Sequence, residues 1–222
     1  MIPKVIYMCD KETTFIEKYS KNWLKLNPEF EVKLYDNVAC ENFLTTEFSP
    51  LHCEVFQYIK DGPIKADFWR VCVLYKYGGY YVDADVEPLV PIREFIDEEA
   101  DFVICTSLYF FKALDPIFMV AEAGNKTLYN CIMVYIKHFN NKFLYSYMTW
   151  SIVTIMKYSN VLKIKSLKKK FGIYNVDDSY KVQILQEVNG ENSYDDHVIY
   201  NNIRLFNNRY KTYDEKNHKF IS

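Results

Sequence analysis

The segment that most constrains the fold of this chain is residues 64–87. Residues 64–77 are largely apolar and predict a buried helix, which Gly78 and Gly79 end. Residues 80–86 predict a strand that carries Asp83 and Asp85 near its carboxyl end. Open parallel sheets bind their ligands beyond the carboxyl ends of the strands. The segment therefore predicts an α/β fold with a polar site at this edge of the sheet.

Two charged residues lie on the predicted helix itself. Asp67 and Arg70 are three positions apart, so they share a face of the helix near its N-terminus. A buried acid and a buried base both need partners. They therefore form a structural ion pair with each other, or they point together into a polar cleft.

The spacing of Asp83 and Asp85 predicts a cation. On a strand, residues two positions apart project to the same side, and two neighbouring carboxylates repel unless a cation lies beside them. Their hard oxygen ligands suit Mn²⁺ or Mg²⁺. Such an ion typically bridges a diphosphate, which favours a nucleotide-sugar site. The alternative is a pair of acids in a solvated turn.

Length and element order favour a single α/β domain over residues 1–222. We expect a nucleotide-sugar-binding half over about residues 1–110 and an acceptor-side half over about residues 111–222. Strands alternating with helices predict a Rossmann-related, mostly parallel sheet flanked by helices. Further expected elements are a first strand over 4–8, a helix over 14–26, strands over 30–35 and 101–106, and helical segments over 116–123 and 128–137.

Composition excludes several classes of protein. A formal net charge of −2 argues against a nucleic-acid-binding protein. No stretch reaches the ~20 apolar residues of a membrane span, and the N-terminus lacks signal-peptide features, so we expect a cytoplasmic protein. The six cysteines contain no C-x-x-C pair and are expected to be buried, reduced thiols. Residues 163–170 carry five lysines, either as a solvated stretch or as a peripheral contact with an anionic membrane.

The combined D-x-x-R, G-G-x-Y and D-x-D pattern resembles the core of the DXD-containing glycosyltransferase family. That family includes capsular polysaccharide glycosyltransferases, yeast initiating mannosyltransferases and, more distantly, the glucosyltransferase domains of large clostridial toxins. The resemblance covers residues 1 to about 90. It is carried by Ala66-Asp67-Phe68-Trp69-Arg70 and by Leu74-Tyr75-Lys76-Tyr77-Gly78-Gly79-Tyr80-Tyr81-Val82-Asp83-Ala84-Asp85.

The resemblance implies a GT-A-like fold, a nucleotide-sugar donor, a divalent metal and retention of the anomeric configuration. Carried over by position, Asp67 and Arg70 hold hydroxyls of the donor sugar, and Asp83 contacts the ribose and the metal region. Asp85 is a direct metal ligand, and Tyr81 lies beside the nucleotide. Tyr7 stands where the family places a base-stacking residue and is the candidate substitute. A UDP-sugar is the favoured donor, with a GDP-sugar as the alternative.

The late part of the chain offers weaker candidates. A further metal ligand is sought among His197, His218, Asn207 and Asn208. Arginines suit bidentate phosphate binding, so Arg204 and Arg209, with Tyr210, are either a diphosphate clamp or part of a polar chain end.

We therefore expect a metal-dependent, retaining glycosyltransferase that moves a hexose to a hydroxyl of a glycan or another acceptor. Its catalytic set is Asp67, Arg70, Asp83 and Asp85. Two alternatives remain open. One is a metal-dependent phosphohydrolase that uses the same two acids, although such sites usually need more carboxylates around two metals. The other is a non-catalytic module that binds a nucleotide sugar or a glycan.

Overall fold

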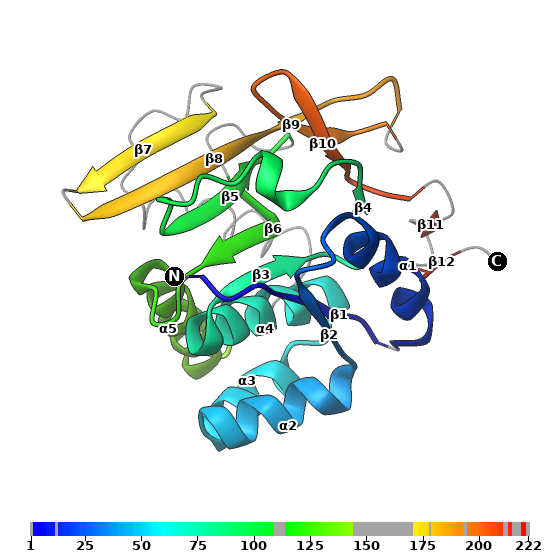
Figure 1. Ribbon diagram of the computed structural model, residues 1–222. Helices are drawn as coiled ribbons and strands as arrows, with labels where there is room; N and C mark the ends of the chain where they lie inside the picture. The colour runs from blue at the N-terminus through cyan, green and yellow to red at the C-terminus, as the bar shows by residue number, and fades with distance from the viewer. Residues whose placement is uncertain are drawn as a thin grey trace.

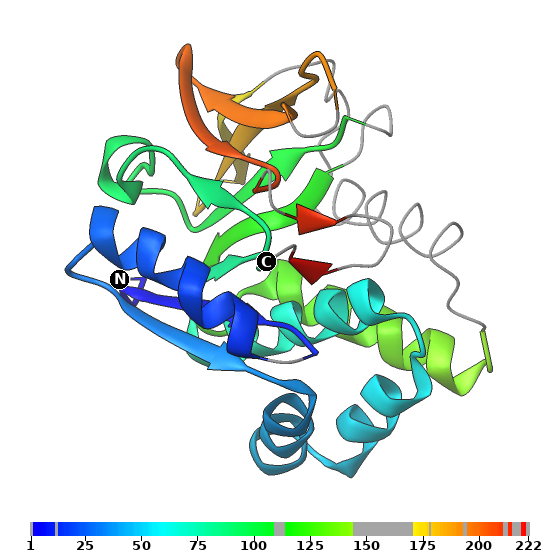
Figure 2. The ribbon, with the colours of Figure 1, turned by 90° about the vertical axis from the view of Figure 1, so that its right-hand side faces the viewer.

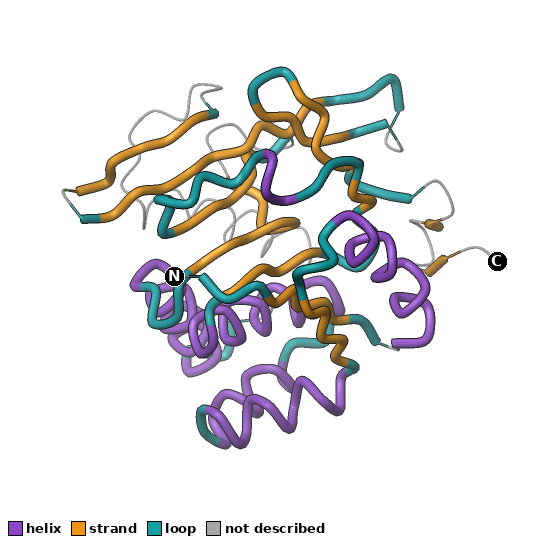
Figure 3. The backbone as a smooth tube through the Cα atoms, in the orientation of Figure 1, coloured by secondary structure: helices purple, strands orange, loops and turns teal. Residues whose placement is uncertain are grey.

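The computed structural model describes residues 2–11, 13–108, 114–143, 171–177, 179–192 and 195–210, together with the backbone of 213–214 and 219–220. Its centre is a ten-stranded sheet (Figure 1). Nine strands follow the order β2-β1-β3-β6-β5-β8-β9-β10-β4, and the tenth, β7, pairs with β8. In the view of Figure 3, α2 to α5 gather below the sheet and α1 lies at its side, whereas β7 to β10 form the end opposite to α2 and α3.

The elements follow one another along the chain in an alternating first half and a strand-rich second half. The helices are α1 Thr13–Leu26, α2 Asn37–Glu47, α3 Pro50–Tyr58, α4 Gly62–Tyr77, the 3-10 helix η1 Ile92–Glu94 and α5 Lys126–Asn140. The strands are β1 Val5–Cys9, β2 Glu31–Tyr35, β3 Gly79–Val82, β4 Glu87–Pro88, β5 Phe102–Thr106, β6 Leu114–Ala121, β7 Gly172–Asp177, β8 Tyr180–Val188, β9 His197–Tyr200, β10 Ile203–Asn207, β11 Tyr213–Asp214 and β12 Lys219–Phe220.

The expected α/β class is confirmed, and the pairings show where the parallel part of the sheet lies. β1 runs parallel to both β2 and β3, and β5 runs parallel to β8. β6 is antiparallel to β3 and to β5, and the remaining described pairings are antiparallel as well. β1, β3, β5 and β8 therefore end at one common edge of a mixed sheet.

Both faces of the sheet are buried, each by a different set of helices. Along β1, Tyr7 faces the core under α2 to α5, whereas Ile6 and Met8 face the core beneath α1. The same alternation continues in β3, where Tyr81 lies on the first side and Tyr80 on the second. Alternation across a strand puts successive side chains on opposite faces, so the near-continuous apolar strands of this chain fit a covered sheet. The view turned by 90° shows α1 lying apart from α4 and α5 (Figure 2).

Two glycines fix how α4 passes into β3. Gly78 ends the helix with φ +66°, and a Cβ there would lie 2.7 Å from the backbone nitrogen of Ala123. Gly79 has φ +110°, and its Cβ would lie 2.8 Å from the carbonyl oxygen of Val5. Left-handed φ and close backbone approach both favour glycine. The double glycine therefore lets β3 pair tightly with β1 directly after a buried helix.

Two expected elements are wrong in the structure. The strand predicted over 80–86 ends at Val82, and residues 84–85 form a turn closed by a hydrogen bond from Val86 N to Asp83 O of 3.2 Å. The helix predicted over 116–123 is instead part of β6. Its apolar residues are buried on both faces of the sheet, and such a short run has no periodicity that separates strand from helix.

All six cysteines are described, and none forms a disulfide. Among the helices that the structure describes, none has both the length and the apolar character needed to cross a bilayer. The lysine-rich residues 163–170 and the candidate His218 lie outside the described residues.

Candidate active site

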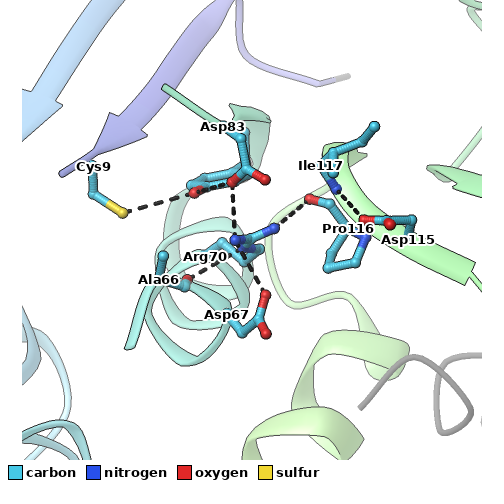
Figure 4. Close-up of polar contacts among 9 residues, drawn as sticks. Cys9, Ala66, Asp67, Arg70, Asp83, Asp115, Pro116 and Ile117 are labelled. Atoms are coloured by element: carbon cyan, nitrogen blue, oxygen red, sulfur yellow. Dashed lines mark hydrogen bonds and ion pairs between the residues drawn. The ribbon is translucent and has the colours of Figure 1, made fainter. Parts of the chain in front are cut away.

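Arg70 is the centre of the polar cluster at the carboxyl edge of the sheet. Its Nη2 lies 3.1 Å from Oδ1 of Asp67 on the same helix and 2.9 Å from Oδ1 of Asp83 after β3. Its Nη1 donates to the carbonyl oxygen of Pro116 at 2.7 Å (Figure 4). Only 4% of the side chain is exposed, so these contacts fix the guanidinium rigidly. The structure thus brings together three residues that the sequence predicts for one site.

Tyr81 contacts both Arg70 and Asp83. Its ring centroid lies 4.3 Å from the guanidinium carbon of Arg70, and its hydroxyl donates to Oδ1 of Asp83 at 2.8 Å. Cys9 Sγ lies 3.8 Å from the same hydroxyl. Tyr81 is fully buried, and its contacts orient Arg70 and Asp83. The resemblance placed this tyrosine beside the nucleotide, and that placement stays a prediction.

The D-x-D acids lie in a turn, so the strand geometry predicted for them is wrong. Asp83 leaves β3 with its backbone nitrogen donating to Ile117 O at 2.9 Å, and Asp85 follows in the turn itself. Both contacts from Arg70 and Tyr81 go to Oδ1 of Asp83. The turn still places the two acids at the carboxyl edge of the sheet, where the sequence predicts the site.

Asp115 is a site residue that the sequence reasoning missed. A bulge separates Ile104 and Cys105, which are consecutive in β5 but pair with Met119 and Asp115 of β6. The extra residues of β6 bring the Pro116 carbonyl to Arg70 and leave Asp115 close enough for the charges of Arg70 and Asp83 to act on it. Bulges commonly re-aim side chains next to active sites. An acid at the start of an unrecognised strand gave no signal for this role.

Burial disfavours the ionised form of the carboxylates in this cluster. Burial raises the pKa of Asp67 to about 7, although Arg70 opposes the shift. Burial also raises the pKa of Asp85 to about 7 and that of Asp115 to about 6, and the charge of Asp83 adds to both shifts. Burial and like charges both disfavour a carboxylate. Additional positive charge would therefore stabilise the ionised carboxylates of this cluster.

The charges around the D-x-D turn are predominantly negative. Four carboxylates, from Asp67, Asp83, Asp85 and Asp115, act on one another and on two guanidinium groups, those of Arg70 and Arg209. When fully ionised, these four carboxylates and two guanidinium groups carry a net charge of −2, and the nearby Asp10 and Asp61 add further negative charge. A divalent cation would offset part of this excess. Carboxylate oxygens are the donors that Mn²⁺ and Mg²⁺ prefer, so the donor set of Asp83 and Asp85 fits such an ion.

The segment after β10 closes over the D-x-D turn. The backbone nitrogen of Tyr210 donates to Asp85 O at 2.9 Å, and Arg209 Nε lies 3.9 Å from Asp85 Oδ2. The side-chain amide of Asn208 donates a hydrogen bond to the buried carboxyl group of Glu187, near the end of β8. Glu187 also accepts a hydrogen bond of 2.7 Å from the backbone nitrogen of Leu108. Glu187, which the sequence reasoning also missed, thus ties this segment to the sheet edge.

Several other predicted residues are not brought to this cluster. Tyr7 is 3% exposed and packs against Tyr35 and Tyr77 in the core, with ring centroids 6.4 and 6.5 Å apart. Asn207 donates to Glu87 at 2.7 Å, and the ring nitrogen Nδ1 of His197 lies 2.6 Å from Asp195 O. Base stacking by Tyr7 and metal ligation by these residues stay predictions.

The described residues do not form a complete metal centre. Within the parts of the chain that the structure describes, no group of three or more His, Cys, Asp and Glu side chains is placed to hold a metal ion. The donor set identified so far is therefore the pair Asp83 and Asp85.

A known family model matches the part of the chain that carries this cluster. Residues 15–102 match the family model described as the glycosyltransferase sugar-binding region containing the DXD motif. This range includes Arg70 and the three residues that contact its guanidinium, Asp67, Tyr81 and Asp83, together with Asp85 in the turn that follows. The predicted resemblance to the DXD-containing glycosyltransferases is confirmed over this range.

Curated relatives show where the similarity extends. An uncharacterized glycosyltransferase of Acanthamoeba polyphaga mimivirus is 34% identical over 91 residues, 39% of this chain and 36% of the relative. Inositol phosphoceramide mannosyltransferase 3 of Schizosaccharomyces pombe is 32% identical over 88 residues, 38% of this chain and 24% of the relative. A mannosyl phosphorylinositol ceramide synthase of Saccharomyces cerevisiae is 23% identical over 195 residues, 84% of this chain and 47% of the relative. The chain thus spans less than half the length of each.

A solved structure shares the fold. The PaToxG glycosyltransferase superposes with a TM-score of 0.54 at 12% sequence identity, covering 74% of this chain and 70% of that chain. At this identity the similarity concerns the fold, and it agrees with a GT-A-like arrangement.

Proposed function

From the DXD glycosyltransferase region over residues 15–102, we propose that this chain is a metal-dependent glycosyltransferase that moves a hexose from a nucleoside diphosphate sugar to an acceptor hydroxyl. The observation that carries the proposal is the convergence of Asp67 and Asp83 on the buried guanidinium of Arg70. One of these acids comes from a helix and the other from the turn after a strand, so the arrangement is a built polar site at the sheet edge.

Each residue of the cluster has a role in this proposal. Asp67 and Arg70 bind hydroxyl groups of the donor sugar, since a buried carboxylate and guanidinium recognise hydroxyls through charge-assisted hydrogen bonds. Asp83 contacts the ribose and, with Asp85, holds the cation. When bound, a divalent cation supplies stabilisation of the negative charge that develops on the departing diphosphate. Asp115 lies close enough to Arg70 and Asp83 to take part in sugar recognition.

The donor is proposed to be a mannose donor, tested alongside UDP-sugars. Two of the relatives that match this chain carry mannosyltransferase or mannosyl phosphorylinositol ceramide synthase in their names. A GDP-sugar therefore becomes a stronger candidate than the sequence alone suggests. As the resemblance implies, we propose that the reaction retains the anomeric configuration, with the departing phosphate helping to take the proton of the acceptor hydroxyl.

Turnover of defined donors tests this function. The purified protein is incubated with GDP-mannose, UDP-glucose and UDP-N-acetylglucosamine, each with Mn²⁺, Mg²⁺ or EDTA, and with or without inositol phosphoceramide or short mannosides. Released nucleoside diphosphate and transferred sugar are both measured. We expect metal-dependent release and transfer with one of these donors, and no activity in EDTA.

Site variants then connect the activity to the cluster. We expect Asp85→Ala and Asp83→Ala to lower turnover by about 100-fold or more while the protein stays folded. Glu54→Ala, which removes an exposed carboxylate on α3, is the matched control and is expected to keep full activity. Full activity of either aspartate variant would contradict the metal assignment. Donor binding without turnover would favour the non-catalytic module, and phosphate release without sugar transfer would favour the phosphohydrolase.

A further inference from the structure

Arg209 lies where positive charge is needed on the D-x-D turn. We propose that in the donor-free protein Arg209 serves as a stand-in cation on Asp85, and that it moves to the diphosphate when metal and donor bind. The inference rests on the proposed function, because it names how that same site exchanges one positive charge for another. It adds a diphosphate-positioning residue that lies outside the range matched by the family model.

The backbone around Arg209 is held firmly against the turn. Tyr210 N donates to Asp85 O at 2.9 Å, and the Tyr210 ring lies 4.4 Å from that of Tyr19. On the other side, Asn208 N donates to Asp196 O at 2.9 Å, and its side chain donates to Glu187. These contacts on both sides hold the Cα of Arg209 beside Asp85.

The side chain of Arg209 places its positive charge beside the carboxylate of Asp85. Its Nε lies 3.9 Å from Asp85 Oδ2, which is beyond hydrogen-bonding distance, and Asp85 and Arg209 are 22% and 21% exposed. The positive charge of Arg209 lowers the pKa of both Asp85 and Asp115. Because this pair is not a hydrogen bond, its loss on donor binding removes mainly electrostatic attraction, which the charge of the diphosphate can replace.

Simple electrostatics predicts the exchange. A divalent cation on Asp85 repels the guanidinium, so Arg209 and the metal compete for this carboxylate when no donor is present. A nucleoside diphosphate reverses the situation, because its oxygens attract both positive charges, and a guanidinium binds phosphate through a bidentate fork. Removing Arg209 should therefore strengthen binding of the metal alone and weaken binding of the nucleoside diphosphate.

The chain offers a matched control in Arg204. This arginine lies on the neighbouring strand β10, and its Nε donates to Asn207 Oδ1 at 2.9 Å. Its Nη2 lies 3.4 Å from Asp195 O, and the residue is exposed. The two arginines are thus equal in charge and five positions apart, but Arg204 is engaged away from the D-x-D turn.

Two binding measurements test the inference. Mn²⁺ binding without nucleotide is measured by electron paramagnetic resonance of free Mn²⁺, and GDP and UDP binding in saturating Mn²⁺ is measured by calorimetry. For Arg209→Ala we expect Mn²⁺ to bind roughly 3- to 10-fold tighter and the preferred nucleoside diphosphate roughly 3- to 10-fold weaker. Arg204→Ala should change neither affinity by more than about twofold. Circular dichroism and thermal unfolding confirm that both variants are folded.

A charge-conserving variant separates the two parts of the exchange. Arg209→Lys keeps a positive charge near Asp85 but lacks the fork, so Mn²⁺ affinity should stay near that of the unaltered protein while diphosphate affinity falls. Unchanged or weaker Mn²⁺ binding by Arg209→Ala would overturn the inference, as would unchanged diphosphate binding. Failure of the proposed function is read separately, from the absence of sugar transfer by the unaltered protein.

Discussion

Arg70 Nη2 lies 2.9 Å from Asp83 Oδ1, and this contact joins the middle of α4 to the turn that follows β3. The same nitrogen also binds Asp67, and Nη1 binds the carbonyl oxygen of Pro116 in β6. One buried guanidinium therefore connects α4, the turn after β3 and strand β6. Its removal should affect stability as well as catalysis.

Arg70→Ala should destabilise the protein by about 3–5 kcal/mol, because it leaves buried carboxylates without their positive partner. The loss should be smaller at pH 5 than at pH 8, since Asp67 and Asp83 can take up protons when the arginine is absent. Urea unfolding at the two pH values measures both effects. Arg93→Ala is the control, because Arg93 is 58% exposed and lies 3.7 Å from Glu29. It should cost less than about 1 kcal/mol.

Asp67→Ala should separate sugar recognition from nucleotide recognition. In the proposed function, Asp67 binds the donor sugar and makes no contact with the nucleotide. We expect binding of the nucleotide sugar to weaken about 10-fold, as for the loss of a hydrogen bond to a charged group. Binding of the free nucleoside diphosphate should change by less than about twofold. Calorimetry with the two ligands in parallel decides the question, and equal losses would contradict this role for Asp67.

Tyr81→Phe tests how Asp83 is kept ionised. The Tyr81 hydroxyl donates to Asp83 at 2.8 Å, and this bond lowers the pKa of Asp83 against the raising effect of burial. Without the hydroxyl, the pKa of Asp83 rises further, so the acidic limb of the pH–activity profile should move to higher pH. The stability loss should be about 1 kcal/mol. Tyr129→Phe, at an exposed position on α5, should leave the profile unchanged. An unshifted acidic limb in Tyr81→Phe would argue against a role for the Asp83 carboxylate in turnover.

The part of the site that the sequence predicts is the part built from local signals. Asp67 and Arg70 are three positions apart on one helix, and helical geometry alone puts them on the same face. Gly78 and Gly79 mark the end of that helix, and the acids follow within a few residues. All of these signals lie within a span of about two dozen residues, which is why pattern and spacing could predict the site.

The missed part depends on long-range pairing. Asp115 enters the site only because β6 pairs antiparallel with β3 and bulges against β5. Glu187 reaches it only because β8 runs parallel to β5 and ends at the same edge. Neither pairing leaves a periodic signal near these acids, and the strand that carries Asp115 was itself expected to be a helix. The D-x-D turn was missed for a related reason. Apolar and acidic residues alternate over residues 82–85 as they would in a strand, and nothing in this pattern marks the turn.

Glu187 gives a prediction on stability that does not depend on ligands. Burial, with a further effect from Asp115, raises its pKa from 4.5 to about 9. Between these two values the folded state binds a proton that the unfolded state has released. The contribution of Glu187 to stability is therefore most favourable below pH 4.5 and is lost as the pH rises toward 9.

Glu187→Gln removes this titration while keeping the polar contacts. A glutamine oxygen can accept the Leu108 amide, and its NH₂ group can donate to Asn208 Oδ1, which is buried without a hydrogen-bond partner in the described residues, once the Asn208 amide turns. The variant should be more stable than the unaltered protein at pH 8 by roughly 1–3 kcal/mol, and the difference should shrink toward pH 5. Chemical unfolding across this range measures it, with the exposed Glu191→Gln as the control. A difference that grows as the pH falls would show that Glu187 is ionised in the fold, because a paired carboxylate contributes its stability at high pH and loses it on protonation.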